Sequence, residues 1–174
     1  MRLLTHYMFT IEITSSIAVL AGMIPNPDGP AIDLPAKYYV AAAAILLLSF
    51  IVNTAIDRLG HTWRSYNGKT IPVRTPNTHG VNNAAKIGLI AGAGAALLAA
   101  AQGNPLYAVP LFIMGFVSPY THLFLDAFTE AGVYNSRGQR VAFAHFKYDN
   151  PAVNLGAVLL GAFVTYAAYT AVFG

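Results

Sequence analysis

Between Lys37 and Asp57 the chain carries no charged side chain, and the middle of this segment reads AAAAILLL. A helix that crosses the hydrocarbon core of a bilayer needs about 20 predominantly apolar residues, and this segment is long enough. Irregular backbone is not tolerated against lipid, because its polar groups would have no partners there. The segment therefore predicts a membrane-spanning helix, and it restricts the fold to helices packed side by side.

Four more apolar segments accompany it. Only 10% of the residues are charged and 56% are hydrophobic, whereas a typical soluble domain has roughly 25% charged residues. Proline- and glycine-containing breaks (PNPDGP, GNP and NP) separate several of the segments. We predict an all-α, polytopic transmembrane bundle of about five spans, forming a single integral membrane domain over residues 1–174. The predicted spans are residues 7–24, 37–56, 84–101, 106–128 and 152–173.

The positions of the basic residues predict the orientation. With five spans, nine of the ten lysines and arginines fall on one side, and Lys37 alone falls on the other. Cytoplasmic loops carry the excess of basic residues, so the N-terminus is expected in the cytoplasm and the protein in the cell membrane. A cleaved signal peptide is disfavoured, because Glu12 interrupts the first apolar segment and no small-residue cleavage site follows. Basic residues are too few for nucleic acid, so the expected partner is the lipid bilayer, and association into a homo-oligomer stays open.

All five histidines fall on the predicted cytoplasmic side. Two of them stand four residues from an aspartate, in the pairs Asp57–His61 and His122–Asp126, and residues four apart share one face of a helix. The chain has no cysteine, which excludes thiolate ligands. Imidazole and carboxylate ligands suit a divalent metal, with Zn²⁺ favoured and Mn²⁺ or Fe²⁺ as alternatives. The candidate metal ligands are His6, Asp57, His61, His79, His122 and Asp126.

Three residues are candidates for catalytic roles. Asp126 or Glu12 could take a proton from water, and Glu12 draws attention because an acidic side chain within a span is often functional. Arg74 could hold a phosphate oxygen through paired hydrogen bonds. Pro119, which lies just before the His122 pair, predicts a kink in the fourth span. The plainer interpretation is that these residues are polar helix ends and loop residues at a membrane interface, and it is favoured for His145.

Three motifs resemble the family of YdjM-like membrane-bound metal-dependent hydrolases. They are Thr5-His6 before the first span, RTPNTH at residues 74–79, and SPYTHLFLDAFTEAGV at residues 118–133. The sequence IDRLGH at residues 56–61 is similar to an uncharacterised archaeal branch of that family. The chain departs from the wider family at Val73, which precedes the loop arginine where a histidine is common, and at Gly80, which replaces a serine. It also has Asp57 alone where paired aspartates are common.

The resemblance implies a membrane-embedded hydrolase with a cytoplasm-facing metal site, and we expect a phosphoester or lipid-like substrate. The alternative is a non-enzymatic membrane scaffold or a partner subunit of a complex, in which the Ala- and Gly-rich spans supply the interface. A transporter is a weaker third possibility, because five spans give no even inverted repeat. Whether residues 62–78 fold over the site as a lid is left open by the sequence.

Overall fold

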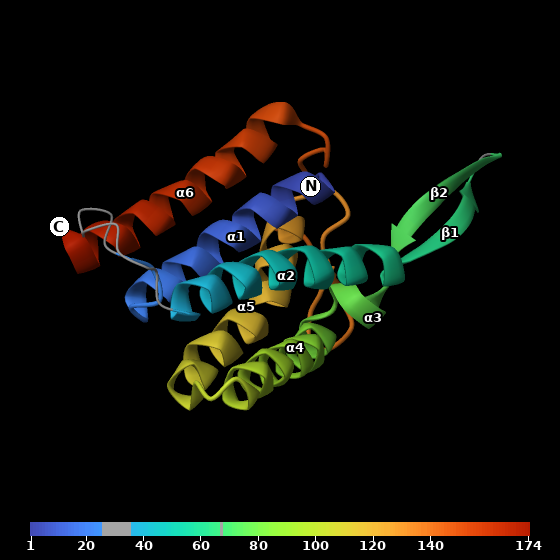
Figure 1. Cartoon of the computed structure of the whole chain (residues 1–174). Helices are drawn as coiled ribbons and strands as arrows, with labels where there is room; N and C mark the ends of the chain where they lie inside the picture. The colour runs from blue at the N-terminus through green and yellow to red at the C-terminus, as the bar shows by residue number, and fades with distance from the viewer. Residues whose placement is uncertain (26–35, 67) are drawn as a thin grey trace.

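The computed structural model describes residues 1–25, 36–66 and 68–174, and its architecture is all-α (Figure 1). The predicted break at residues 26–30 lies outside these described residues. The helices are α1 (Leu3–Leu20), α2 (Ala36–Leu59), α3 (Pro76–His79), α4 (Val81–Ala101), the short 3₁₀ helix η1 (Pro105–Tyr107), α5 (Ala108–Ala127) and α6 (Pro151–Phe173).

Within the described ranges, five helical segments are long and apolar enough to cross a membrane, as predicted. The boundaries differ most at α1, which begins at Leu3 instead of near residue 7 and ends at Leu20 instead of residue 24. The early start is possible because the polar side chains of the first turns bond to protein. The hydroxyl of Thr5 donates to Oδ1 of Asn154 on α6, at 2.6 Å.

Helix α1 lies at the centre of the bundle and contacts α2, α5 and α6, while α4 packs along α5 (Figure 1). The Gly-rich helix α4 packs closely against α5. A Cβ atom on Gly88 would lie 2.5 Å from the carbonyl oxygen of Phe116, and one on Gly92 would lie 2.6 Å from that of Phe112. Both distances are too short for a real Cβ, so the two helix backbones can approach this closely only because these positions are glycine.

Two strands between α2 and α3 form a β-hairpin that was not predicted from the sequence. Strand β1 (His61–Tyr66) pairs antiparallel with β2 (Lys69–Arg74), with His61 opposite Arg74. Figure 1 shows the hairpin projecting beyond the end of α2, away from the helices. The short helix α3 then returns the chain to the bundle, so this loop brings both Arg74 and His79 to the ends of the spans.

A second, smaller hairpin lies between α5 and α6, where β3 (Val133–Tyr134) pairs with β4 (Arg140–Val141). The N-terminus, the β1–β2 hairpin and this segment meet at one end of the bundle, because Met1 and Arg74 both contact Asp126 at the end of α5. The three segments predicted to share one side of the membrane therefore do share one end of the protein.

Candidate metal centre

The carboxylate of Asp126 lies at the middle of a cluster of buried polar groups. Asp126 occupies the last turn of α5 and is fully buried. Its Oδ1 atom accepts a hydrogen bond of 2.7 Å from Nη2 of Arg74 and one of 3.1 Å from the amino group of Met1. Its Oδ2 atom has no hydrogen-bond partner among the described residues.

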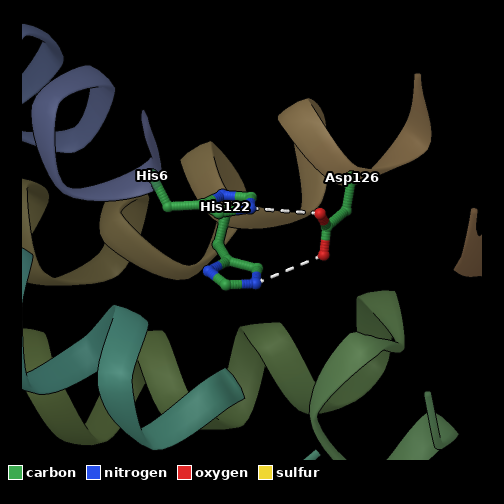
Figure 2. A group of neighbouring side chains, drawn as sticks. All are labelled: His6, His122 and Asp126. Carbon is green, nitrogen blue, oxygen red and sulfur yellow. Dashed lines mark ion pairs between the residues drawn. The ribbon is translucent and has the colours of Figure 1, made fainter. Parts of the chain in front are cut away.

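Three histidines from three helices surround this carboxylate. His6 of α1 places Nε2 3.1 Å from Oδ1, while His122 of α5 and His79 of α3 place Nε2 3.2 Å and 3.5 Å from Oδ2. All three rings are buried, with at most 2% of the side chain exposed. Figure 2 shows His6 and His122 converging on Asp126 from α1 and α5, and their rings are stacked with centroids 3.9 Å apart.

The hydrogen-bond pattern around His122 fixes where its proton lies. The side-chain amide of Asn53 donates to the backbone carbonyl of Ser49, at 2.7 Å, and a carbonyl can only accept. The oxygen of Asn53 therefore faces Nδ1 of His122, 2.9 Å away, and Nδ1 must be the donor. A neutral His122 then carries no proton on Nε2, whose lone pair is directed toward Asp126.

His79 also carries its proton on Nδ1. The hydroxyl of Thr78 donates to the carbonyl of Ile56, at 2.9 Å, so its oxygen accepts from Nδ1 of His79, at 3.1 Å. Burial lowers the pKa of His79 well below its usual range, in spite of the opposing effect of Asp126, and keeps the ring neutral. The Nε2 atom of His79 is therefore also unprotonated.

Three lone-pair atoms thus face one another inside the protein. Nε2 of His79, Nε2 of His122 and Oδ2 of Asp126 are buried and make no hydrogen bond within residues 1–25, 36–66 and 68–174. Leaving such groups unpaired is costly, and their mutual repulsion adds to that cost. A divalent cation among them would satisfy all three, and histidines that bind metals characteristically donate their other ring N–H to a protein acceptor, as both do here.

Asp57 and His61, at the end of α2, lie close to this cluster. Ligand atoms of His6, His122 and Asp126 lie within 4.8 Å of one another, and so do those of Asp57, His79 and His122. His61 donates from Nδ1 to the carbonyl of Asp57, at 2.5 Å, and its ring lies 5.1 Å from that of His79. The structure therefore brings together five of the six residues that the sequence suggested as ligands. His61 belongs to neither group but lies beside them, and it shares the more exposed rim with Asp57.

The other candidates are placed differently. The guanidinium of Arg74 contacts Asp126 and also donates to Thr129 and to the carbonyl of Gly132, so it is held by the protein itself. Glu12 lies six residues beyond His6, about 9 Å further along α1, and its carboxylate packs against α6. The structure does not bring Glu12 to the cluster. His145 is exposed and outside both groups of candidate ligands.

Two further residues of the site, Asn53 and Thr78, were given no role from the sequence, and Thr78 was noted only as part of the RTPNTH motif. Their signal was position alone, since Asn53 precedes Asp57 by one helical turn and Thr78 directly precedes His79. Both residues lie behind a candidate ligand and determine its tautomer.

A cleft of about 1040 Å³ opens beside the cluster. Its walls come from the start of α1, the end of α2, the β1–β2 hairpin and the segment after α5. The lining includes Met1, Asp57, His61 and Arg74, so the candidate metal ligands at the rim and the residue that holds Asp126 both face it. The cluster is therefore adjacent to a space large enough for a small-molecule ligand.

The family described as "Protein of unknown function (DUF1286)" matches residues 1–125, and the chain belongs to that family. The matched stretch includes five of the six candidate ligands and ends one residue before Asp126. No curated protein and no solved structure matches the chain.

Proposed function

We propose that this member of a family of unknown function is a membrane-embedded, metal-dependent hydrolase of the cell membrane that acts on a phosphoester or lipid-like substrate. Its metal centre would be formed by His79, His122 and Asp126, with His6, Asp57 and His61 completing the ligand set. The observation that carries the proposal is the convergence of two unprotonated Nε2 atoms and one carboxylate oxygen that make no hydrogen bond with the described residues.

The donor set suits Zn²⁺, and also Mn²⁺ or Fe²⁺, because it combines imidazole nitrogen with carboxylate oxygen. Such an ion, when bound, supplies Lewis-acid activation of a phosphoryl or carbonyl oxygen and lowers the pKa of water. The basic residues concentrated at this end of the chain support a cytoplasmic orientation.

The protein's own residues hold the site in place. Arg74 engages Oδ1 of Asp126 and leaves Oδ2 directed at the two histidines. Asn53 and Thr78 keep the protons of His122 and His79 on the side away from the cluster. The more exposed Asp57 and His61 line the cleft, where they can meet a substrate or accept a proton from water.

Metal analysis of the purified, detergent-solubilised protein tests the metal centre. We expect one or two equivalents of a transition metal, lost in the double variant His122→Ala/Asp126→Ala. His145→Ala is the matched control, since this exposed histidine is not among the candidate ligands. A protein that stays metal-free after incubation with Zn²⁺ and with Mn²⁺ contradicts the proposal.

Hydrolysis is tested separately with soluble aryl phosphoesters and with phospholipids in mixed micelles. The expected result is metal-dependent turnover in the wild-type chain and in His145→Ala, and none in the double variant. A stably bound metal without turnover of any phosphoester or carboxylic ester would instead indicate a structural metal in a membrane scaffold.

A further inference from the structure

The cleft beside the metal centre is lined by more positive than negative side chains. Four arginines line it, against two carboxylates, Asp57 and Glu130. The arginines are Arg2, Arg58, Arg74 and Arg140. A concave site with this excess of guanidinium groups concentrates anions.

The arginines differ in how far the protein already uses them. Arg74 is engaged by Asp126, Thr129 and Gly132, which leaves it little capacity for a ligand. Arg58 is exposed, and its side chain makes no hydrogen bond or ion pair with any residue of the described ranges. Arg140 donates one Nη2 hydrogen bond to the carbonyl of Glu130, which orients its guanidinium and leaves further N–H groups free.

We propose that Arg58 and Arg140 form an anion subsite that binds the phosphate group of the substrate, and that this substrate is an amphiphile. Arg58 reaches the cleft from the end of α2 and Arg140 from strand β4, so two separate elements present forked donors to one space. Guanidinium forks match the paired oxygens of a phosphate. As a statement about the substrate, this inference rests on the proposed function.

The apolar residues that line the cleft support an amphiphilic substrate. Trp63, Ile71, Pro72 and Val73 of the β1–β2 hairpin and Leu3 of α1 give the cleft apolar walls. Leu3 is the first residue of a helix that is long and apolar enough to span a membrane, so an apolar substrate could reach this wall from a bilayer. At about 1040 Å³ the cleft exceeds what a lone phosphate fills, and it leaves room for an attached apolar or glycerol portion.

Trp63 makes the subsite directly measurable, because it lines the cleft and is the chain's one tryptophan. Its fluorescence is followed in neutral detergent micelles during titration with glycerol phosphate in one arm and with a short-chain phosphatidic acid in the other. We expect a saturable change in at least one arm. A response to the lipid alone, or a tighter one to the lipid, supports both parts of the proposal. An equal response to both ligands, or a response to glycerol phosphate alone, supports the anion subsite and overturns the amphiphilic substrate.

The variants Arg58→Gln and Arg140→Gln are each expected to weaken the apparent affinity about tenfold, the effect of losing one charge-assisted hydrogen bond. Arg64→Gln is the matched control, since Arg64 adjoins Trp63 in the hairpin but does not line the cleft. An unchanged fluorescence in both arms, or equal losses in Arg64→Gln, overturns the subsite.

The two proposals fail separately. If the wild-type chain holds a metal and hydrolyses phosphoesters but the arginine variants bind phosphate normally, the subsite is wrong and the hydrolase stands. If the fluorescence titration gives the expected pattern while the protein holds no metal, the anion subsite stands and the proposed reaction fails.

Discussion

Nε2 of His122 lies 3.2 Å from Oδ2 of Asp126, yet no hydrogen bond joins these two buried atoms. The reason lies on the opposite side of the ring, where Nδ1 donates to Asn53. The one N–H of the neutral ring is therefore on Nδ1, where it donates to the oxygen of Asn53, and Nε2 and Oδ2 are left as two acceptors.

Asn53→Ala is therefore expected to weaken metal binding although Asn53 is not itself a ligand. Losing such a supporting hydrogen bond typically costs 10- to 100-fold in metal affinity, on the order of 1–3 kcal/mol. Asn53→Asp should retain more affinity than Asn53→Ala, because a carboxylate also accepts from Nδ1. Competition with a chromogenic chelator measures the difference. Equal affinities in wild type and Asn53→Ala would contradict this role.

Ser49→Ala controls for general disturbance of this region. It removes a buried hydroxyl that donates to the carbonyl of Tyr7 but keeps the Ser49 backbone carbonyl that orients Asn53. Its metal affinity should match that of the wild-type chain.

Thr78 accepts the hydrogen bond from Nδ1 of His79, as Asn53 does for His122. Substitutions of nearly equal volume test this role. Thr78→Val keeps the shape but leaves Nδ1 of His79 without an acceptor, so metal affinity should fall by about tenfold. Thr78→Ser keeps the hydroxyl and should bind metal nearly as well as the wild-type chain. If Thr78→Val and Thr78→Ser show the same metal affinity in the chelator competition, the hydroxyl does not position His79.

Gly60 allows α3 to approach the end of α2. A Cβ atom there would collide with Oγ1 of Thr78 and with the carbonyl oxygen of Ile56, and would lie 2.5 Å from Cε1 of His79. Gly60→Ala should displace His79, lower the stability by about 1–3 kcal/mol and weaken metal binding. Thermal melting in detergent and metal analysis measure the two effects.

Gly94→Ala is the comparison for that variant, because a Cβ on Gly94 meets no atom within 4 Å. Its melting temperature and metal content should stay at wild-type values or rise slightly. Should Gly60→Ala behave in the same way, the close approach at Gly60 is not required for the site.

Arg74 and Asp126 form an ion pair that is nearly dry, with 11% and 0% of their side chains exposed. Arg74→Met leaves a buried carboxylate without its shortest hydrogen bond and should lower the free energy of unfolding by about 3 kcal/mol. Arg74→Met/Asp126→Asn should recover part of that loss, because no buried carboxylate remains without its arginine, although the amino group of Met1 then loses its charged partner. A double-mutant cycle on melting in detergent measures the coupling, and additive effects of the two substitutions would show that the pair is not coupled.

The sequence was enough to predict the helical bundle and the residues of the cluster, because both depend on local patterns. Apolar segments of about 20 residues directly predict membrane-spanning helices. His122 and Asp126 stand four residues apart, so the pitch of one helix brings them to the same face. The β1–β2 hairpin was missed because its strands lack a buried face: residues 62–65 and 68–72 are exposed, so no alternation of apolar and polar residues marks them.

The supporting contacts were missed for another reason. His122 and Asn53 stand 69 residues apart, and Arg74 and Asp126 stand 52 apart. Nothing in the local pattern around Asn53 shows that its oxygen would meet an imidazole. Glu12 was chosen as a candidate only because it is an acidic residue within a span. Its position along α1, six residues beyond His6, separates it from the cluster.

Glu12 nevertheless restricts which residue can stand opposite it on α6. A Cβ atom on Gly161 of α6 would collide with Oε2 of Glu12 and lie 2.9 Å from its Cδ. The two positions, 149 residues apart, therefore share one volume. Among related chains they should vary together: a residue larger than glycine at the position of Gly161 should be accompanied by a side chain shorter than glutamate at the position of Glu12.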